Sequence, residues 1–278
     1  MSVGDKSYDR EGSKVYSELK QSPVRLAIER YTIFKLVESA RPQLLDGASV
    51  LDLACGDGTY SRECVRRGAK RVVGLDMSEE ILILARGKSL EIEEGKVGFF
   101  KADCSKLSEV RMALEGSGLK ADSEEKFDVI LVNWFFVNAK NEDELTEMVK
   151  VCAVYLKPGS GVMVGMNVHP DTLPRPPDFW KRYNLIRRTP NFDFEKDGAA
   201  LREGELLEAN VLNDEGKVVW SVQNYFWSRA KLQEVFRSQG LELEVVECSC
   251  DPTMVNDYWR GLLQTPPFSC LRAAANAS

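Results

Sequence analysis

The sequence predicts an α/β fold, namely a doubly wound, mainly parallel seven-stranded sheet with a β-hairpin-containing insertion after the fifth strand. Two observations lead to this prediction. From about residue 23 to residue 167, short apolar strands alternate with amphipathic helices, as in parallel sheets built from crossover units. This alternation of strands and helices then stops, and it resumes later for one helix and two strands. With 278 residues, we expect one domain over 1–278.

The first part of the chain supplies helices and three strands. Pro23 opens a helix at its first turn, and apolar residues recur at helical spacing through 24–40. The whole stretch 1–45 is expected to be a helical N-terminal segment. The apolar run 48–54 predicts the first strand. The next expected elements are a helix over 60–67, a strand over 71–75, a helix capped by Ser78, and a strand over 97–101.

The central part completes the parallel pattern. A fourth strand is expected over 127–133 and a helix over 142–156, which Lys157-Pro158-Gly159 ends. The fifth strand follows over 161–168. These connections give a parallel sheet whose strand ends share one edge, where ligands of such sheets bind.

The stretch 168–227 departs from this pattern. It opens with four prolines, and two β-rich runs flank Asp214-Glu215-Gly216, which predicts a hairpin. We expect this insertion to form a lid over the substrate. Ser228 then caps a helix that Gly240 ends. The last expected elements are a sixth strand over 241–248 and a seventh over 268–273 at the edge of the sheet.

The strongest local signal is the loop Gly56-Asp57-Gly58 between the first strand and the following helix. Glycines allow a tight turn and close approach of a ligand, and a helix N-terminus offers free N–H groups. Asp76 ends the next strand, twenty residues after Gly56, where a carboxylate can accept hydrogen bonds from both ribose hydroxyls. This combination predicts a nucleoside-containing cofactor.

Two kinds of cofactor compete for this loop. A dinucleotide site wants a third glycine, but Ser61 occupies that position. Asp57 also stands at the mouth of the helix, where it would repel a pyrophosphate. A cofactor with a sulfonium and an amino group has no such conflict. A tight turn without any ligand is the remaining alternative.

The run VLDLACGDGTYSR and the acid that ends the second strand resemble class I S-adenosylmethionine-dependent methyltransferases. Later pieces agree in order, including Asp103-Cys104 after the third strand, FDVILVNW and LKPGSG. The resemblance covers about residues 16–167. The segments YSELKQSPVRLAIERYTIF and YFWSRAKLQEVFRSQGL are similar to toxoflavin-synthase-like small-molecule methyltransferases.

The resemblance implies cofactor-binding roles for particular residues. Gly56 would lie against the methionine portion, with Asp52 supporting the loop. Asp76 would bind the ribose, and Met77 would pack on the adenine. The remaining implied contacts are Asp103 and the Cys104 backbone at the adenine, Asn133 and Trp134 at the methionine amino group, and Tyr16 and Arg25 at that same end.

Arg25 has two interpretations. It pairs the cofactor carboxylate in one and belongs to a solvated helix face in the other. The N-terminal segment 1–45 is expected to cover the cofactor.

Methyl transfer from a sulfonium needs alignment and exclusion of water more than it needs a catalytic triad. A base is required only if the acceptor loses a proton. His169, the sole histidine, directly follows the fifth strand and is the candidate catalytic base or substrate contact. A solvated loop histidine is the alternative.

Composition favours a small-molecule substrate. The formal net charge is −6, with 43 acidic and 37 basic residues, so the main affinity term for nucleic acid is missing. The fourth strand ends in NWFF rather than the Asn/Asp-Pro-Pro-aromatic turn of many methyltransferases that act on amino groups of nucleic acids and proteins. Several aromatics are candidates for an aromatic-lined pocket or for ordinary packing: Trp134, Phe135, Phe136, Phe179, Trp180, Tyr183, Trp220, Tyr225, Phe226 and Trp227.

The seven cysteines are scattered without a CxxC pair, so we expect reduced thiols, a cytoplasmic protein and no structural zinc. The acidic stretches predict solvated faces rather than metal ligands. The sequence contains no run of about 18 apolar residues, so no membrane span is predicted. The oligomeric state is left open.

We therefore predict an S-adenosylmethionine-dependent methyltransferase that acts on N, O or S of a small, aromatic or heteroaromatic metabolite. A protein that binds the nucleoside without catalysis is the alternative from another class. An NAD-dependent oxidoreductase is the less favoured alternative, because the third glycine is missing.

Overall fold

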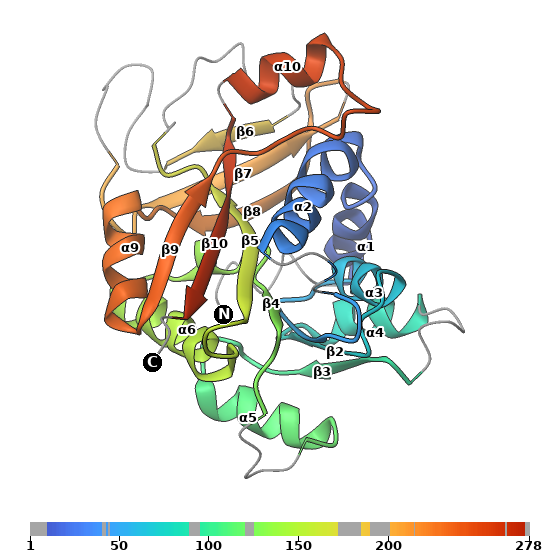
Figure 1. Ribbon diagram of the computed structural model, residues 1–278. Coiled ribbons are helices and arrows are strands. Elements are labelled where there is room, and N and C mark those ends of the chain that lie inside the picture. Colours follow the sequence, from blue (N-terminus) through green and yellow to red (C-terminus); the bar gives the residue numbers. More distant parts are fainter. Residues whose placement is uncertain are drawn as a thin grey trace.

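The computed structural model describes residues 10–40, 43, 45–88, 95–119, 125–171, 185–189, 201–213, 215–264 and 266–275. A seven-stranded sheet forms its centre, in the order β3-β2-β1-β4-β5-β10-β9 (Figure 1). The first five of these strands pair in parallel, and β10 pairs antiparallel with both β5 and β9. The predicted doubly wound, mainly parallel fold is confirmed.

The strands and helices of the first half follow the sequence closely. The strands are β1 (Ser49–Leu53), β2 (Arg71–Asp76), β3 (Val97–Lys101), β4 (Val129–Leu131) and β5 (Val162–Val168). The helices are α1 (Arg10–Leu19), η2 (Arg25–Arg30), α2 (Tyr31–Ala40), α3 (Thr59–Arg66), α4 (Glu79–Gly87), α5 (Leu107–Gly116) and α6 (Glu142–Tyr155). The expected helix after Pro23 therefore begins with a π-helical turn, η2.

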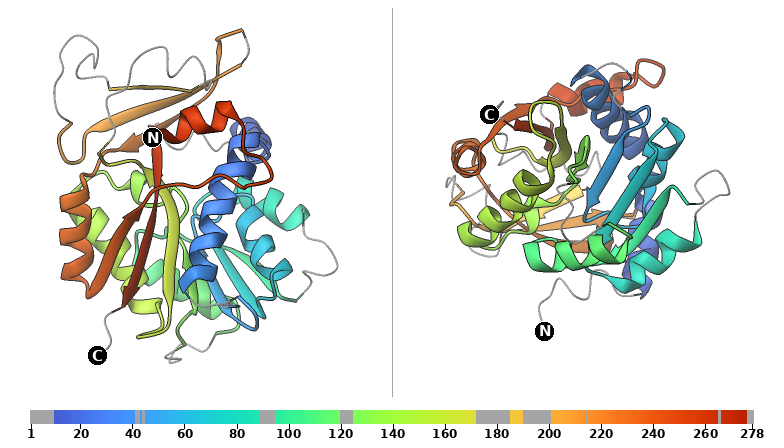
Figure 2. Two further views of the ribbon diagram at one scale, coloured as in Figure 1. Left: turned by 45° about the horizontal axis from the view of Figure 1, so that its top comes forward. Right: turned by 60° about the horizontal axis from the view of Figure 1, so that its bottom comes forward.

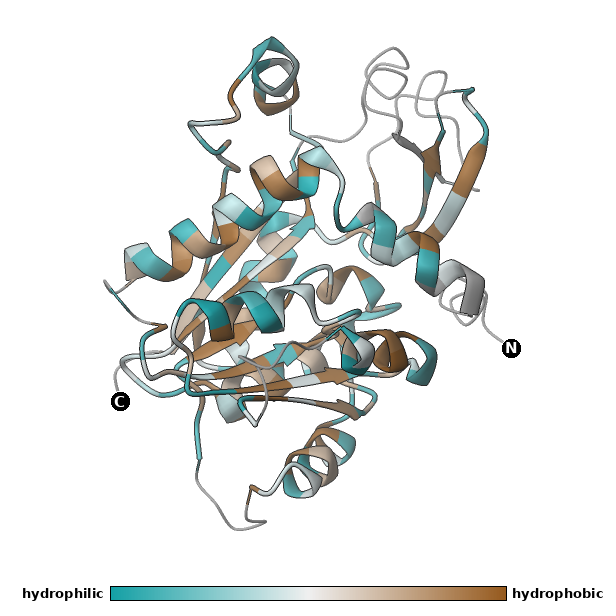
Figure 3. Cartoon of the chain, turned by 90° about the vertical axis from the view of Figure 1, so that its right-hand side faces the viewer, coloured by the Kyte–Doolittle hydropathy of each residue, from teal (hydrophilic) through white to brown (hydrophobic). Residues whose placement is uncertain are grey.

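Two apolar cores flank the sheet. The helices α5, α6 and α9 (Arg229–Ser238) cover one face, and α2 and α3 cover the other. Figure 2 shows these layers from two further sides. Hydrophobic residues lie along the strands and the inner sides of the helices (Figure 3). None of the described helices is long and apolar enough to cross a membrane.

The insertion forms a second sheet. Its antiparallel strands are β6 (Leu185–Arg188), β7 (Leu206–Leu212) and β8 (Val218–Tyr225), in the order β6-β7-β8. The predicted hairpin is β7–β8, whereas β6 was not predicted. The second sheet and α10 (Asp257–Gln264), also unpredicted, lie at the carboxyl ends of the parallel strands, at the top of Figure 1.

The seventh strand, β10 (Phe268–Ala275), was placed wrongly at the edge. It lies between β5 and β9 (Leu241–Val246), and β9 is the edge strand. Burial explains the order, because β10 is buried on both faces over most of its length, whereas β9 begins by alternating buried and exposed residues. Arg272 makes β10 resemble an edge strand in the sequence, but its guanidinium pairs with Glu244 across to β9.

Candidate functional site

The glycine loop joins β1 to α3 in a tight left-handed path. Ala54, Gly56 and Gly58 have φ values of 56°, 57° and 72°, in the region that favours glycine. A Cβ on Gly56 would lie 3.0 Å from Cε1 of Tyr16 on α1. The bare backbone at Gly56 therefore lets α1 approach the loop closely.

Asp76 at the end of β2 braces this loop. Its Oδ2 accepts the Gly56 N–H at 2.9 Å, and its Oδ1 accepts the Ser78 N–H at 3.0 Å. Burial raises the pKa of Asp76, and these backbone bonds oppose that shift. A carboxylate has about four acceptor positions, so lone pairs remain for the hydroxyls of a ligand. The predicted role at a ribose fits this geometry.

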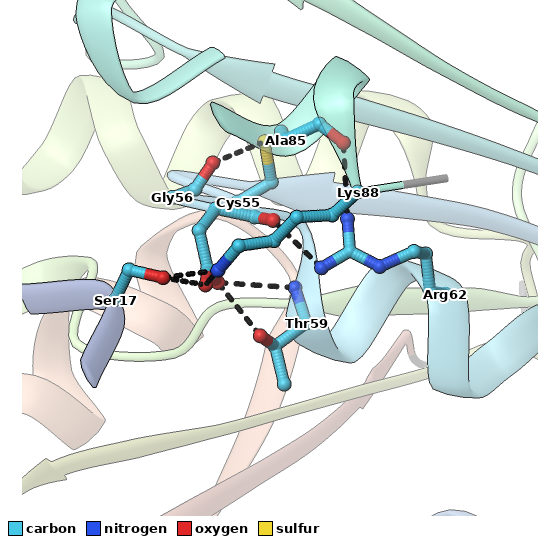
Figure 4. A network of polar contacts seen from close by, with 8 residues as sticks. Ser17, Cys55, Gly56, Thr59, Arg62, Ala85 and Lys88 are labelled. Carbon is cyan, nitrogen blue, oxygen red and sulfur yellow. Dashed lines mark hydrogen bonds and ion pairs between the residues drawn. The ribbon is translucent and has the colours of Figure 1, made fainter. Parts of the chain in front are cut away.

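Asp57 ties three helices together at the loop (Figure 4). Its carboxylate accepts Ser17 Oγ of α1 at 2.8 Å, Lys88 Nζ after α4 at 2.9 Å and Thr59 Oγ1 of α3 at 2.7 Å. Burial raises the pKa of Asp57, but these donors outweigh it and lower the pKa. Because Lys88 offsets the charge, repulsion of phosphate by Asp57 is a weaker argument than the sequence suggested.

Ser61, at the position of a third glycine, binds Asp52 instead. Its hydroxyl donates to Asp52 Oδ2 at 2.5 Å, and both side chains are buried. Burial raises the pKa of Asp52 to about 7, since the bond from Ser61 offsets only part of that cost. Ser61, which stands in place of a third glycine, therefore connects α3 to β1.

The turn η2 carries an ion pair, Arg25 with Glu29. Glu29 is 2% exposed and also accepts the Tyr60 hydroxyl and, at 3.0 Å, Trp134 Nε1; Lys20 Nζ lies 3.5 Å away. Burial alone would raise the pKa of Glu29, but these partners lower it to about 2. Arg25 is half-buried and paired, so the solvated-face interpretation of this residue is wrong.

Trp134 follows β4 in an unusual backbone conformation. Its φ is 58°, which is rare for a bulky residue. The Trp134 N–H donates to Met166 O at 2.8 Å, and the indole packs edge-on against Phe268. The neighbouring Asn133 is buried, and among the described residues its Nδ2 has no hydrogen-bond partner. An orphaned donor here fits a ligand with acceptor oxygens.

A cavity of about 490 Å³ lies between the side chains of Arg25, Glu29 and Trp134 and the strands β7 and β8 of the insertion. Arg25 and Glu29 are the charged side chains among its described lining residues, and β7 and β8 supply apolar ones such as Val211 and Val222. Six aromatic side chains, from four elements and the turn after β4, are among its described lining residues: Tyr16, Trp134, Trp220, Tyr258, Trp259 and Phe268.

The predicted site residues fall into two groups. Tyr16, Arg25 and Trp134 line the cavity. The others lie at strand ends around the loop. Met77 is 64% exposed beside Asp76. Asp103 accepts from Ser105 and pairs with Lys106, and the Cys104 thiol is buried near Leu75 O.

His169 lies outside the described cavity lining. Its Nε2 contacts Glu247 Oε1 at 2.9 Å, and its Nδ1 accepts the Asp171 N–H at 3.2 Å. The ring is buried, so the alternative of a solvated histidine is wrong. With both nitrogens occupied, this geometry lends no support to the predicted catalytic base, which stays a prediction.

Sequence reasoning missed Glu29 and half of the aromatic lining, namely Tyr258, Trp259 and Phe268. An Arg and a Glu four residues apart ordinarily indicate a surface pair. Of the ten aromatics considered, Trp134 and Trp220 line the cavity. Phe179, Trp180 and Tyr183 lie outside the described residues. Tyr258 and Trp259 had no signal, because only the tertiary fold brings α10 to the cavity.

Comparisons with known proteins agree with this geometry. Residues 50–159 match the model of a methyltransferase domain family. A probable protein arginine N-methyltransferase 6 of Arabidopsis thaliana is 28% identical over 145 residues, which cover 50% of this chain but only 30% of that protein. Demethylmenaquinone methyltransferase of Lactococcus lactis is 28% identical over 166 residues, 58% of each chain.

Solved structures match over nearly the whole chain. The CcbJ methyltransferase of Streptomyces caelestis has a TM-score of 0.62 at 17% identity and covers 98% of this chain and 99% of its own. The sugar N-methyltransferase KedS8 of a Streptoalloteichus species has a TM-score of 0.58 at 17% identity, with 95% and 92% covered.

The solved structures show that this chain has the class I methyltransferase fold, and residues 50–159 match a methyltransferase domain. This match favours S-adenosylmethionine over a nicotinamide cofactor. The narrower resemblance to toxoflavin-synthase-like enzymes stays a prediction.

Proposed function

We propose that the protein transfers the methyl group of S-adenosylmethionine to a small aromatic or heteroaromatic metabolite. The observation that carries this proposal is the cavity, because it joins Arg25 and Trp134 at the cofactor side to Trp220 of the insertion and to the aromatic side chains of α10. The sugar N-methyltransferase KedS8, which has the same fold, supports the small-molecule part of the proposal. The acceptor atom in our proposal is N, O or S.

The cofactor, when bound, supplies a methyl group activated by a sulfonium. In our proposal Asp76 and Met77 hold its nucleoside, together with Asp103 and the Cys104 backbone. Gly56, Asn133 and Trp134 enclose the methionine end, with Tyr16 and Arg25 above it. The orphaned Nδ2 of Asn133 and the close approach at Gly56 support this arrangement.

The insertion 168–227 acts in this proposal as the substrate lid, and the N-terminal segment 1–45 covers the cofactor. The contact between Tyr16 and Trp220, with ring centroids 5.8 Å apart, supports a joint roof. Such a roof excludes water and aligns the acceptor, which is the protein's main task in a displacement of this kind.

The described lining residues offer no ready base. Glu29 is held by four donors with its pKa lowered to about 2, and burial raises the pKa of the Tyr16 hydroxyl well above its ordinary value. We therefore favour an acceptor whose lone pair is available near neutral pH, such as an aromatic amine.

We also propose a cytoplasmic location, because the seven cysteines form no disulfide bonds.

The test is methyl transfer from radiolabelled S-adenosylmethionine to a panel of amino-, hydroxy- and thiol-substituted aromatic and heteroaromatic compounds. Label should enter an aromatic acceptor in wild type and be lost in Asp76→Asn. Glu79→Gln, an exposed acid on the adjacent helix, is the matched control. Label entering aliphatic compounds or peptides instead would refute the proposed acceptor class.

A further inference from the structure

Glu29 is a buried carboxylate whose partners come from four parts of the chain. Arg25 belongs to the same turn, Lys20 follows α1, Tyr60 lies on α3 and Trp134 follows β4. Three of these donor groups form hydrogen bonds to the carboxylate, and Lys20 forms an ion pair with it at 3.5 Å, whereas a carboxylate has about four acceptor positions. Glu29 therefore binds mainly its own neighbours, although it lies in the cavity wall.

Two uncommon backbone features meet at this carboxylate. Arg25 and Glu29 lie on the π-helical turn η2, and such turns are rare and frequent at functional sites. Trp134 has its φ at 58°. Conformations of this kind persist only where the surroundings fix them. Glu29 is the partner that both features share.

Charge makes the arrangement depend on Glu29. Lys20 and Arg25 are two buried or half-buried cations beside one carboxylate, so without Glu29 they would repel each other. Arg25 also stacks on the Trp134 ring, with its guanidinium carbon 5.1 Å from the centroid. Loss of Glu29 would free the guanidinium and remove the acceptor of the indole N–H together.

We propose that Glu29 is a positioning residue, whose carboxylate fixes Arg25 and Trp134 in the orientation that binds the methionine end of the cofactor. The inference rests on the proposed function, because it takes Arg25 as the partner of the cofactor carboxylate. It goes further in that Glu29 acts through Arg25 and Trp134, without contacting a reactant.

The first experiment is a double-mutant cycle on the Kd of S-adenosylhomocysteine, measured by calorimetry on the full chain. Glu29→Gln and Arg25→Met should each weaken binding about tenfold or more, the effect of losing one charge-assisted hydrogen bond. The double variant should lose less binding free energy than the sum of the two single losses, because Glu29 acts partly through Arg25 and partly through Trp134. Additive losses, or wild-type binding by Glu29→Gln, would overturn the proposal.

Glu38→Gln is the matched control, since Glu38 is an exposed acid on α2 that pairs with Arg67 at 2.6 Å. Its Kd should equal that of wild type. If Glu29→Gln does not fold, Glu29→Asp is tested in the same cycle, because it keeps the charge but is one methylene too short to reach Tyr60 and Trp134 together. We expect it to weaken binding less than Arg25→Met.

The second experiment needs no cofactor. It measures how strongly acrylamide quenches the fluorescence of Trp134. The contribution of Trp134 is the difference between each protein and the same protein with Trp134→Phe. Glu29→Gln should increase the quenching, whereas Glu38→Gln should not, and unchanged quenching would overturn the link to Trp134. Failure of wild type to bind S-adenosylhomocysteine would instead refute the proposed function, and with it the effect on the cofactor.

Discussion

The loop side and the cavity side of the site are held together differently. Around the loop, several bonds join residues within 52–78, such as Gly56 N–H to Asp76 and Cys55 N–H to Leu75 O at 2.9 Å, and Asp57 adds bonds to Ser17 and Lys88. Around the cavity, Tyr16, Trp220 and Trp259 come from distant parts of the chain. The glycine loop is thus held largely by bonds between nearby strands and turns, whereas the cavity depends on how the insertion and α10 pack.

Two buried carboxyl groups, Asp52 at the loop and Glu29 at the cavity, differ in the same way. Asp52 is 1% and Glu29 2% exposed, yet the pKa of Asp52 is about 7 and that of Glu29 about 2. Asp52 has one hydroxyl donor from its own βα unit, and Glu29 has four donors, two of which are cations. Partners, rather than burial, decide which acid is ionised.

The largest expected effect tests these two acids. Folded Asp52 keeps its proton up to about pH 7, whereas the unfolded chain releases it near pH 4. Stability should therefore fall as pH rises between those values, by about 1.4 kcal/mol per unit and about 4 kcal/mol in all. Urea unfolding from pH 5 to 8 measures the slope, and Glu29 does not titrate in that window.

Asp52→Asn should make this slope much shallower, and Asp76, whose pKa is also raised by burial, contributes to the slope that remains. The control Asp257→Asn, at an exposed acid, should retain it. An identical slope in wild type and Asp52→Asn would mean that the two acids do not differ as described.

The next effect concerns the loop side alone. Asp76→Asn should weaken S-adenosylhomocysteine binding on the order of a hundredfold, about 3 kcal/mol, because a ribose and the Gly56 N–H lose a charged acceptor. Calorimetry measures the Kd, and Glu79→Gln should leave it unchanged. A loss below threefold would argue against Asp76 as the ribose partner.

A smaller effect separates the cavity side from the loop side. Trp220→Ala should raise the KM of an aromatic acceptor about tenfold, the value of one aromatic contact or slightly more, with the Kd of S-adenosylhomocysteine unchanged. Val218→Ala, two residues away on β8 and 57% exposed, is the control. An equal change in both constants would show that the two sides are not separate.

The smallest effect concerns the joint between the insertion and the main domain. Ser228 caps α9 by accepting the Lys231 N–H at 3.2 Å, and its hydroxyl donates to Glu203 at 2.5 Å. Ser228→Ala should cost about 1 kcal/mol of unfolding free energy, measured by urea denaturation. Ser238→Ala, near the end of the same helix, should cost less. Equal losses would contradict the cap.

Local patterns determined much of this protein. Apolar runs and turn residues located the strands of the main sheet, and Ser78 and Ser228 marked helix starts that the structure confirms. The glycine loop and the acid twenty residues later indicated a nucleoside site. These features could be read because each depends on neighbours in the chain.

Tertiary packing decided the rest. It put β10 inside the sheet. It also brought His169 to Glu247, and Tyr60 and Trp134 to Glu29, which are pairs of residues 31 to 105 positions apart. Such contacts leave no period or spacing in the sequence. Desolvation and charge pairing then set the ionisation of Asp52 and Glu29, and both exist only once the chain has folded.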